Sequence, residues 1–353
     1  MTEPHRPRVK YVIGPDGSPL TIADLPAPVP GVDEILVRVA ACGICGSDVH
    51  GYDGTSGRRI PPIVMGHEAA GVVAAAGPGV GNFKPGDRVT FDSTVYCGQC
   101  EFCLRGDVNL CNNRQVIGVS CGDFRRAGAF AEYVVVPQRI AYHLPDALEF
   151  QEAAMLEAVS VALHAVRVSE MKGGETVLVI GAGMIGLLTL QAAKAGGASR
   201  VLVADIDRSR LQTAEKIGAD ETLLLSGAEL TQEILQRTGG RGVDLVLEAV
   251  GRNETIAAGI ASVRKGGTVT LIGNISPEVK IPLQVVVSRQ IRLQGSCASS
   301  GEYPQAMELI ANGQIKVKQL ITAVAPLSEG PRWFARLHAG EPNLMKVVLD
   351  PGA

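Results

Sequence analysis

The stretch TVLVIGAGMIGLLTLQAAKAGG, residues 176–197, contains the features that decide the fold. A continuous apolar run ends at three glycines, Gly181, Gly183 and Gly186, and an apolar, alanine-rich segment follows and ends at two more glycines. An uninterrupted apolar run is typical of a strand buried on both faces, and a glycine-terminated segment of this length is typical of a helix. The residues therefore predict a strand, a tight turn and a helix, the opening unit of a parallel α/β sheet.

The three glycines form a G-x-G-x-x-G pattern, which in this context indicates a bound dinucleotide. Gly181 permits the tight turn, Gly183 lets the backbone approach a pyrophosphate, and Gly186 allows the helix to pack closely on the strand. The start of the helix offers free N–H groups to the phosphates. A glycine turn needed only for packing and a methyltransferase-type nucleotide site are the alternatives, and the strand–helix alternation around the motif argues against the first.

Asp205 ends the next apolar strand, roughly twenty residues beyond the glycines, where a carboxylate binds the adenosine ribose diol. A carboxylate there repels a 2'-phosphate, so the residue favours NAD over NADP, although Arg208 and Arg210 lie just beyond it. Arg210 either packs along the adenine or is a solvated helix residue. The remaining expected cofactor contacts are Met184, Ile185, Ile272 and Gly273.

The same alternation of strands and helices continues toward the C-terminus and predicts a doubly wound parallel sheet. Residues up to about 150 read instead as short strands separated by Gly, Pro and Asp, followed by a helix over residues 151–168. The last strand, residues 345–349, is too short to be a domain and is expected to return to the first, β-rich unit. The predicted domains are 1–155 with 294–353, and 156–293.

Composition suits a soluble globular protein with two core-forming units. The chain has 353 residues, 46% hydrophobic and 20% charged, with a formal net charge of -3. This charge offers no basic field for nucleic acid or anionic lipid, so the expected partner is a small molecule. The N-terminus lacks the features of a signal peptide and no apolar run is long enough to span a bilayer, so we expect a cytoplasmic location.

Four of the eight cysteines crowd into one loop, Cys97-x2-Cys100-x2-Cys103-x7-Cys111. Four thiolates form a closed tetrahedral shell, which suits a structural zinc and leaves no position for substrate. An iron–sulfur cluster is the main competitor, because the first three cysteines have ferredoxin-like spacing. The seven-residue gap before the fourth cysteine, with no proline after it, favours zinc.

A second set of metal-binding residue types lies earlier in the chain. Cys45 stands in the loop GICGSDVH, His67 and Glu68 stand in GHEAAG, and Glu157 stands near the start of the predicted helix. A catalytic zinc needs a few thiolate, imidazole or carboxylate ligands and one open position. Taken singly, each residue has an ordinary explanation as a core or surface residue, so the argument depends on their joint occurrence.

The pattern GHExxGxxxxxGxxV, matched from Gly66 to Val80, resembles the zinc signature of the medium-chain dehydrogenase/reductase superfamily. The Cys45-Gly-Ser-Asp element, the four-cysteine loop and the later glycine pattern occur in that family's order. Within the superfamily, CGSDVH, GHE and the glutamate of LEAVSVALHA look most like the sorbitol and other polyol dehydrogenases. The resemblance spans essentially the whole chain. It implies a GroES-like catalytic domain, a Rossmann domain, and an active site in the cleft between them.

The resemblance also implies the roles of individual residues. Cys45, His67 and a carboxylate, either Glu68 or Glu157, would bind a catalytic zinc that acts as a Lewis acid on the substrate oxygen. Asp48 would orient a zinc ligand. Ser47 would pass the hydroxyl proton toward His50 and solvent, while hydride goes to the nicotinamide.

The expected reaction is oxidation of a secondary alcohol, a polyol or sugar-derived alcohol, to the ketone with NAD. A threonine dehydrogenase-like amino-alcohol oxidoreductase and a non-catalytic NAD-binding protein on the same scaffold are the alternatives. Sorbitol dehydrogenases carry an Arg-Tyr pair where an ungapped alignment puts Ala298 and Ser299, which bears on how substrate hydroxyls are recognised. Arg125 and Arg126 either contact an anionic group of the substrate or are solvated loop residues.

The resemblance further implies a homo-oligomer, a tetramer or dimer, assembled through the Rossmann sheets. The run at residues 280–287, KIPLQVVV, is expected to be either an edge strand or a buried strand.

Overall fold

The computed structural model describes residues 20, 22–51, 59, 63–119 and 125–352, and it divides into two compact units. Unit 1 comprises Met1–Glu157, Tyr303–Ala311 and Val317–Ala353, and unit 2 comprises Ala158–Glu302 and Asn312–Lys316. None of the helices in these described ranges is long and apolar enough to cross a membrane.

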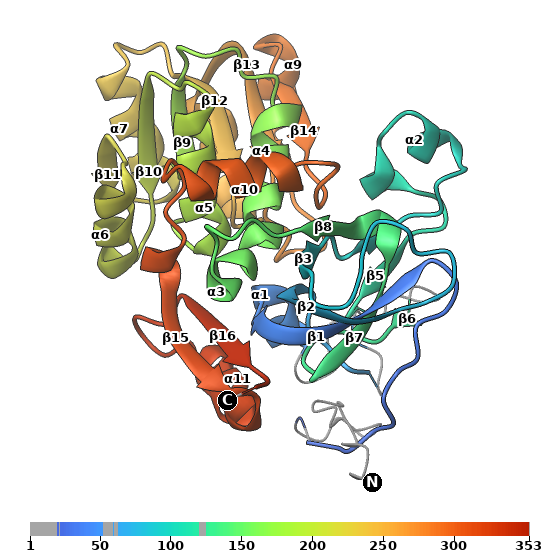
Figure 1. Cartoon of the computed structure of the whole chain (residues 1–353). Helices are drawn as coiled ribbons and strands as arrows, with labels where there is room; N and C mark the ends of the chain where they lie inside the picture. The colour runs from blue at the N-terminus through green and yellow to red at the C-terminus, as the bar shows by residue number, and fades with distance from the viewer. Residues whose placement is uncertain (1–19, 21, 52–58, 60–62, 120–124, 353) are drawn as a thin grey trace, which may run out of the picture. The chain divides into compact units, whose positions relative to one another are not determined.

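Unit 2 contains a six-stranded parallel sheet with the order β11-β10-β9-β12-β13-β14 (Figure 1). The strands are β9 (Thr176–Ile180), β10 (Arg200–Ala204), β11 (Glu221–Leu223), β12 (Val243–Glu248), β13 (Val263–Leu271) and β14 (Arg292–Gly295). β9 is the first strand of unit 2 along the sequence and lies between β10 and β12, so the strand order reverses there. Ligands of doubly wound sheets bind at this switch point, and the Gly181 motif directly follows β9.

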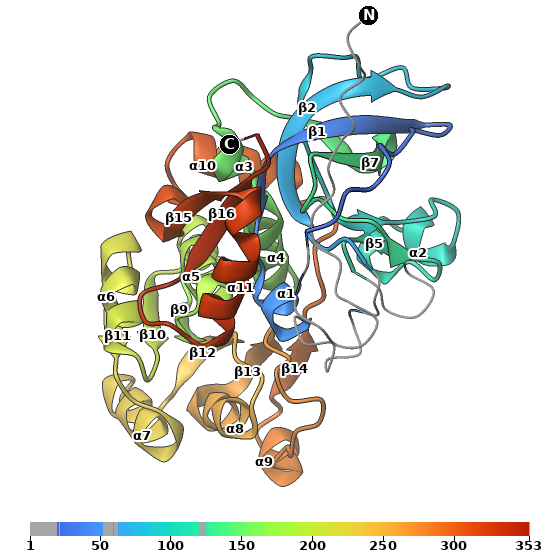
Figure 2. The ribbon, with the colours of Figure 1, turned by 90° about the horizontal axis from the view of Figure 1, so that it is seen from below.

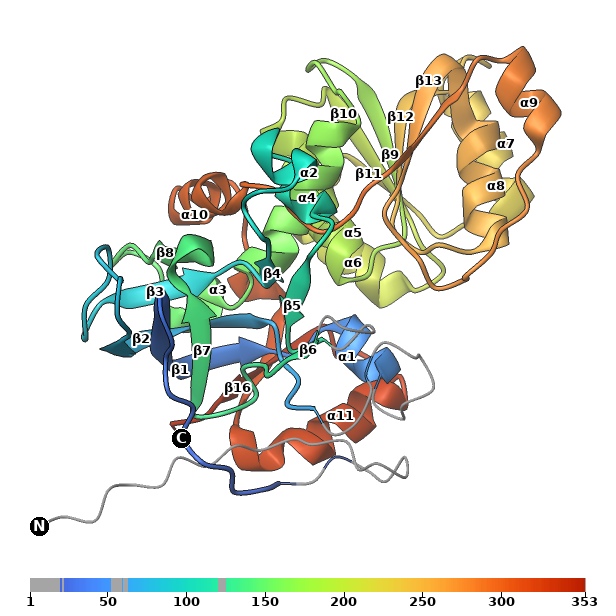
Figure 3. The same ribbon diagram turned by 90° about the vertical axis from the view of Figure 1, so that its right-hand side faces the viewer.

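Helices cover both faces of this sheet, as Figure 3 shows with the sheet seen nearly edge-on. On one side lie α5 (Met184–Ala195) and α6 (Arg208–Ile217), and on the other lie α7 (Gly227–Arg237), α8 (Asn253–Ser262) and α9 (Leu283–Ser288). The central strands are buried on both faces, which explains their uninterrupted apolar sequences. The predicted doubly wound fold is confirmed.

The interpretation of residues 280–287 as a strand was wrong. Pro282 precedes the short helix α9, whose Val285 and Val286 pack on the core of unit 2 while Leu283 and Val287 remain exposed. A run of β-branched residues favours a strand only weakly, and packing on the sheet overrides that preference here.

Unit 1 is built around a seven-stranded sheet with the order β15-β16-β1-β2-β3-β8, in which β7 also pairs with β1. Its strands are β1 (Glu34–Gly43), β2 (Glu68–Ala76), β3 (Arg88–Phe91), β7 (Tyr133–Pro137), β8 (Ala141–His143), β15 (Ile321–Pro326) and β16 (Lys346–Asp350). A smaller sheet contains β4 (Thr94–Val95), β5 (Gln115–Ile117) and β6 (Arg125–Arg126). β16 pairs antiparallel with β1, placing the red C-terminal strand beside the blue β1 in Figure 2. The end of the chain therefore returns to the first unit, as expected.

The helices of unit 1 are short. They are α1 (Gly46–Gly51), α2 (Glu101–Leu104), α3 (Phe150–Ala153), α10 (Tyr303–Ala311) and α11 (Gly330–His338), with 3-10 turns at Val108–Leu110, Gln138–Ile140, Lys318–Leu320 and Leu327–Glu329. α4 (Leu156–Val168) begins in unit 1 and continues into unit 2. The helix predicted over residues 151–168 is thus interrupted between α3 and α4, and Ala154 at the break packs with Ala41 and Val348.

The unit boundaries differ from the predicted ones in detail. Residues 294–302, which we expected in the first domain, group with unit 2, because β14 extends the sheet of unit 2 to Gly295.

Candidate active site and cofactor sites

The four cysteines of the 97–111 loop converge around one point of unit 1. Their sulfur atoms all lie within 4.8 Å of one another, with 3.9 Å between Cys97 and Cys103 and 3.5 Å between Cys100 and Cys103. A tetrahedral shell with zinc–sulfur bonds of about 2.3 Å separates neighbouring sulfurs by about 3.8 Å. The arrangement therefore fits a single zinc ion. It does not fit a multi-iron cluster, whose thiolates bind different irons and stand further apart.

Backbone groups in this loop favour the thiolate form that a metal requires. Hydrogen bonds from the backbone at Gln99 and Cys100 lower the pKa of Cys97 to about 6. The backbone N–H groups of Cys97 and Asn113 each donate to the sulfur of Cys111 at 3.3 Å. Desolvation in the crowded thiol cluster raises the pKa of Cys103 to about 12, so this thiol keeps its proton until a metal displaces it.

A second group in unit 1 brings together three of the predicted catalytic residues. Cys45 precedes α1, while His67 and Glu68 stand at the start of β2, which pairs antiparallel with β1. One ligand atom from each lies within 4.8 Å of the others, and His67 and Glu68 are buried. Thiolate, imidazole and carboxylate are the donor types of a catalytic zinc that keeps a position open. The donor set fits such an ion.

Asp48 contacts both Cys45 and His67. Its Oδ2 accepts a hydrogen bond from the backbone N–H of Cys45 at 3.2 Å, and its Oδ1 lies 3.4 Å from Nδ1 of His67. Burial alone would raise the pKa of the Asp48 carboxyl, but His67 and Arg59 lower it well below its usual range. Asp48 is therefore an ionised carboxylate beside His67, at the place predicted for a residue that orients a metal ligand.

Two glutamates were left open as zinc ligands, and their surroundings differ. Glu68 belongs to the three-residue group, whereas Glu157 does not among the described residues. Burial, together with the charges of Glu68 and Asp92, raises the pKa of Glu157 to about 7, although His67 and Lys346 act in the opposite direction. The geometry thus associates Glu68 with the metal position and leaves Glu157 as a neighbouring acid whose charge varies near neutral pH.

Lys346 is a residue of this site that sequence reasoning missed. Its Nζ donates to Oε2 of Glu68 at 2.6 Å and to the backbone carbonyl of Ile44 at 3.2 Å, and both side chains are almost fully buried. The only sequence signal is a lysine at the start of an otherwise apolar terminal strand, and that pattern has many ordinary explanations.

The predicted proton-relay residues lie on α1, directly after Cys45. Ser47 and His50 are both exposed, and Oγ of Ser47 accepts a hydrogen bond of 3.2 Å from Nη2 of Arg59. Arg59 also was not singled out from the sequence.

In unit 2, the three glycines of the motif differ in backbone angle and in the space around them. Gly181 has a φ of 97°, and a Cβ on Gly186 would lie 1.7 Å from the carbonyl oxygen of Gly181. A Cβ on Gly183, which caps α5, would meet no atom within 4 Å. Open space in front of a helix start, next to Met184 and Ile185, fits a pyrophosphate.

Asp205 faces this turn from the end of β10. Its Oδ2 accepts from the backbone N–H of Ala182 at 2.6 Å, and its Oδ1 accepts from that of Asp207 at 2.8 Å. Ile206 beside it is 80% exposed, an apolar surface suited to a nucleobase. Arg210 lies 3.6 Å from the carboxylate of Asp207, at the start of α6.

Ile272 and Gly273 follow β13, and their backbone N–H groups donate to the carbonyl of Glu248 at 2.9 and 3.0 Å. A Cβ on Gly273 would lie 2.2 Å from the backbone of Val250. These two residues hold the ends of β12 and β13 together beside the switch point.

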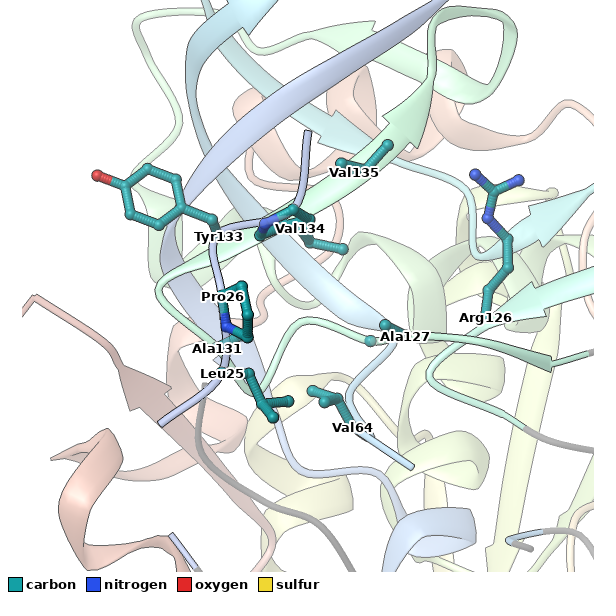
Figure 4. Close-up of a pocket in the computed structure, with 11 residues that line it drawn as sticks. Leu25, Pro26, Val64, Arg126, Ala127, Ala131, Tyr133, Val134 and Val135 are labelled. Carbon is teal, nitrogen blue, oxygen red and sulfur yellow. The ribbon is translucent and has the colours of Figure 1, made fainter. Parts of the chain in front are cut away.

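A pocket of about 370 Å³ on unit 1 has no comparable chemistry. Figure 4 shows Leu25 and Val64 pointing toward one another within it, with Arg126 at a distance from them. Arg126 forms an ion pair with Glu34 and donates to Gln115 at 3.4 Å, so it has a structural role. The Arg125 side chain lies outside the described part of the structure.

Comparisons with known proteins agree with this geometry. A family model described as "Alcohol dehydrogenase GroES-like domain" matches residues 31–146, and one described as "Zinc-binding dehydrogenase" matches residues 185–312. The chain is 35% identical over 337 residues to sorbitol dehydrogenase of Bacillus subtilis, covering 94% of each protein. It is 36% identical over 327 residues to probable D-xylulose reductase A of Arthroderma otae, covering 90% of this chain and 91% of that protein. A solved Escherichia coli oxidoreductase/dehydrogenase of unknown specificity superposes with a TM-score of 0.91 at 32% identity, covering 98% of this chain and 99% of the other.

Proposed function

We propose that this chain, which belongs to the zinc-dependent alcohol dehydrogenase family, oxidises a secondary alcohol group of a polyol or sugar-derived alcohol to the ketone with NAD. The convergence of Cys45, His67 and Glu68 in unit 1 carries the proposal. An intact glycine motif followed by Asp205 in unit 2 supplies the second requirement, a place for the nicotinamide cofactor.

The substrate class is argued from the relatives. Sorbitol dehydrogenase and D-xylulose reductase interconvert polyols and ketoses by their names, and both align over at least 90% of this chain. Ala298 and buried Ser299 stand where the sequence alignment expected an Arg-Tyr pair. On that alignment, we propose that the remote hydroxyls of the substrate are recognised by other side chains than an Arg-Tyr pair.

In the proposed reaction, zinc and the nicotinamide supply the chemistry at the substrate, and residues of the chain bind the zinc and move the proton. When bound, zinc supplies a Lewis acid for the substrate oxygen and the nicotinamide accepts the hydride. Cys45, His67 and Glu68 would hold the zinc, and Asp48 keeps His67 oriented. Ser47 Oγ would receive the proton of the substrate hydroxyl.

His50 would pass that proton on to water, because it is exposed on the same short helix and an imidazole can both accept and donate a proton. Lys346 pairs with the buried carboxylate of Glu68 and thereby fixes its position beside the metal ligands.

NAD is preferred over NADP in this proposal. The Asp205 carboxylate is already oriented by two backbone N–H groups at the end of β10, and a 2'-phosphate at the same place would face its charge.

We also infer a homo-oligomer, a dimer or tetramer, in a reducing, cytoplasmic compartment. β14 pairs only with β13 among the described strands, so it leaves one sheet edge open, and exposed Leu283 and Val287 lie on the neighbouring α9. An open edge and an apolar surface favour pairing with a second copy. A four-thiolate zinc site is most secure where cysteines stay reduced.

The proposal is tested by following reduced nicotinamide absorbance with polyols, sugars, sugar phosphates, threonine and simple alcohols, with NAD and NADP in parallel. Turnover of a polyol with NAD is the expected result. Turnover of threonine alone would support the amino-alcohol alternative, and no turnover by protein that binds zinc and NAD would favour a binding protein.

Metal content separates the two zinc sites. Metal analysis should find two zincs per chain in the wild type and one in Cys45→Ser. The variant should still bind NAD, but its kcat/KM should fall by at least about 100-fold. This magnitude is expected because even residues that only orient zinc ligands contribute about 10- to 100-fold. Cys297→Ser, which changes an exposed cysteine of unit 2, is the matched control. Retained turnover in Cys45→Ser would contradict the assignment of the catalytic metal.

A further inference from the structure

Arg59 is the most deeply buried arginine side chain among the described residues, and it lies next to the metal-binding residues of unit 1. The residue is 2% exposed. Gly51, the last residue of α1, makes room for it, because a Cβ there would lie 2.2 Å from Cγ and 3.2 Å from Cβ of Arg59. A permanent charge is rarely buried without a specific partner, so its contacts define its role.

Those contacts bridge the proton-relay serine and the carboxylate behind the metal ligands. Nη2 of Arg59 donates to Oγ of Ser47 at 3.2 Å and to Oδ1 of Asp48 at 2.7 Å. Asp48 in turn accepts from the backbone N–H of Cys45 and lies 3.4 Å from Nδ1 of His67. One guanidinium nitrogen therefore couples the position of the Ser47 hydroxyl to the residue that orients His67.

The contact with Ser47 determines which way that hydroxyl can donate. A serine hydroxyl has one proton and two lone pairs, whereas a guanidinium has only donors. Because Arg59 occupies a lone pair of Ser47 and accepts nothing, the serine proton must point to another acceptor. The remaining lone pair stays available for an incoming proton.

From these contacts we propose that Arg59 is a positioning residue for the Ser47 hydroxyl, holding Oγ in one rotamer with a free lone pair for the substrate proton. This inference rests on the proposed function, in which Ser47 receives that proton. Arg59 itself never exchanges a proton, since its guanidinium stays charged at all relevant pH values.

Two features favour arginine over lysine for this task. The planar guanidinium has a rigid arrangement of donors, and a charge-assisted bond to Asp48 anchors it while a second bond reaches Ser47. An ammonium group on a flexible stem would keep the ion pair with Asp48 but would not hold the serine at a fixed angle. The Lys variant therefore separates the positioning role from the charge.

The experiment is a double-mutant cycle between Ser47 and Arg59. Ser47→Ala should lower kcat by about 100-fold, the lower end of the effect of a positioned proton-transfer group. Arg59→Gln and Arg59→Lys should each lower kcat by about 10-fold or more while zinc content, NAD affinity and KM change little. In the Ser47→Ala background the same Arg59 changes should have an effect of less than about 3-fold, because residues that act through one another are not additive.

Independent losses that multiply in the double variant would overturn the proposal, as would full rescue by Arg59→Lys. Arg88→Gln is the control: Arg88 donates to the backbone carbonyls of Pro145 and Leu148 in unit 1, and its substitution should show no coupling to Ser47. Gly51→Ala provides a second route, since it displaces Arg59 without removing its charge, and it should reproduce the kcat loss of Arg59→Lys.

A readout independent of activity distinguishes a failure of this inference from a failure of the proposed function. In crystal structures of the zinc-loaded wild type and Arg59→Gln, Oγ of Ser47 should occupy one rotamer in the first and leave it in the second, with the α1 backbone unchanged. An unchanged rotamer in Arg59→Gln overturns the positioning role whatever the enzyme turns over. An inactive wild type with the expected rotamer change would instead count against the proposed dehydrogenase.

Discussion

At the scale of single residues, the buried ion pair between Lys346 and Glu68 shows how distant parts of the chain complete the site. The two residues are separated by 278 positions, yet their charged atoms lie 2.6 Å apart in the interior of unit 1. Burial by itself would lower the pKa of Lys346, but the charges of Glu68 and Cys45 raise it above its usual value. Lys346 is therefore a permanent cation beside a predicted zinc ligand.

Replacing Lys346 by Met should destabilise the protein, because it leaves the Glu68 carboxylate buried without its partner. Breaking a buried pair in this way lowers the free energy of unfolding by about 3–5 kcal/mol, measurable by denaturant titration. Lys318→Met removes an exposed lysine that pairs with Glu149, and its effect should be much smaller, because solvent screens that ion pair. Equal effects of the two substitutions would contradict the assigned importance of the buried pair.

Asp205 controls cofactor choice in the proposed function. Asp205→Ala should shift the ratio of kcat/KM for NAD and NADP toward NADP by at least about tenfold, or about 1.4 kcal/mol, because the repelling carboxylate is gone. Asp207→Asn is the control: it removes the neighbouring carboxylate, but an asparagine side chain can still cap α6 through Ser209 and Arg210, so the cofactor preference should not change. An unchanged ratio in Asp205→Ala would remove the ribose role.

At the scale of secondary-structure elements, a buried cluster ties α4 to the segment after β14 within unit 2. Glu302 accepts from Nη2 of Arg167 and contacts Nδ1 of His164, both at 2.9 Å, and accepts from the backbone N–H of Ser300 at 2.5 Å. Burial alone would raise the pKa of Glu302, but these partners lower it below its usual value. The ionised carboxylate thus stabilises the contact between the two segments.

Glu302→Gln should lower the free energy of unfolding by about 1–3 kcal/mol at neutral pH. The depressed pKa gives the sign of the pH dependence: the contribution is complete above the unfolded-state pKa of a glutamate and is lost as the pH falls through the folded-state pKa. The gap between wild type and variant should therefore close in acid. Glu341→Gln, which breaks an exposed pair with Arg336, is the control and should show a much smaller gap. A gap that persists at low pH would contradict the explanation.

At the scale of the whole molecule, the order of strands in unit 2 leaves β14 with one open edge, next to exposed apolar residues of α9. In the seven-stranded sheet of unit 1, the strand β16 from the end of the sequence pairs with β1 and lies between β15 and β1. The open edge is the feature from which we infer a second copy.

Leu283→Glu places a charge on this apolar surface, where Leu283 is 68% exposed. The variant should shift the solution mass, measured by light scattering after size exclusion, toward the monomer without changing thermal stability. Val29→Glu, at an 84% exposed valine of unit 1, should leave the mass unchanged. A monomeric wild type, or an unchanged mass in Leu283→Glu, would contradict the inferred assembly.

Local patterns in the sequence determined a large part of this protein. The glycine motif after β9, Asp205 after β10 and the thiols of the 97–111 loop depend on spacing along a few turns of chain, which sequence alone specifies. The family and the doubly wound sheet were predicted on these grounds and are confirmed. The site residues remain predictions that the geometry supports.

Tertiary structure decided the features that depend on pairing across the chain. Glu68 meets Lys346 only because β16 joins the sheet that contains β1 and β2, and Arg59 reaches Ser47 and Asp48 only because Gly51 leaves space for it. Within the run at 280–287, a helix begins at Leu283 because packing on unit 2 outweighs the strand preference of valine. Such contacts follow from register and packing among distant segments, and a linear pattern of residue types does not encode them one by one.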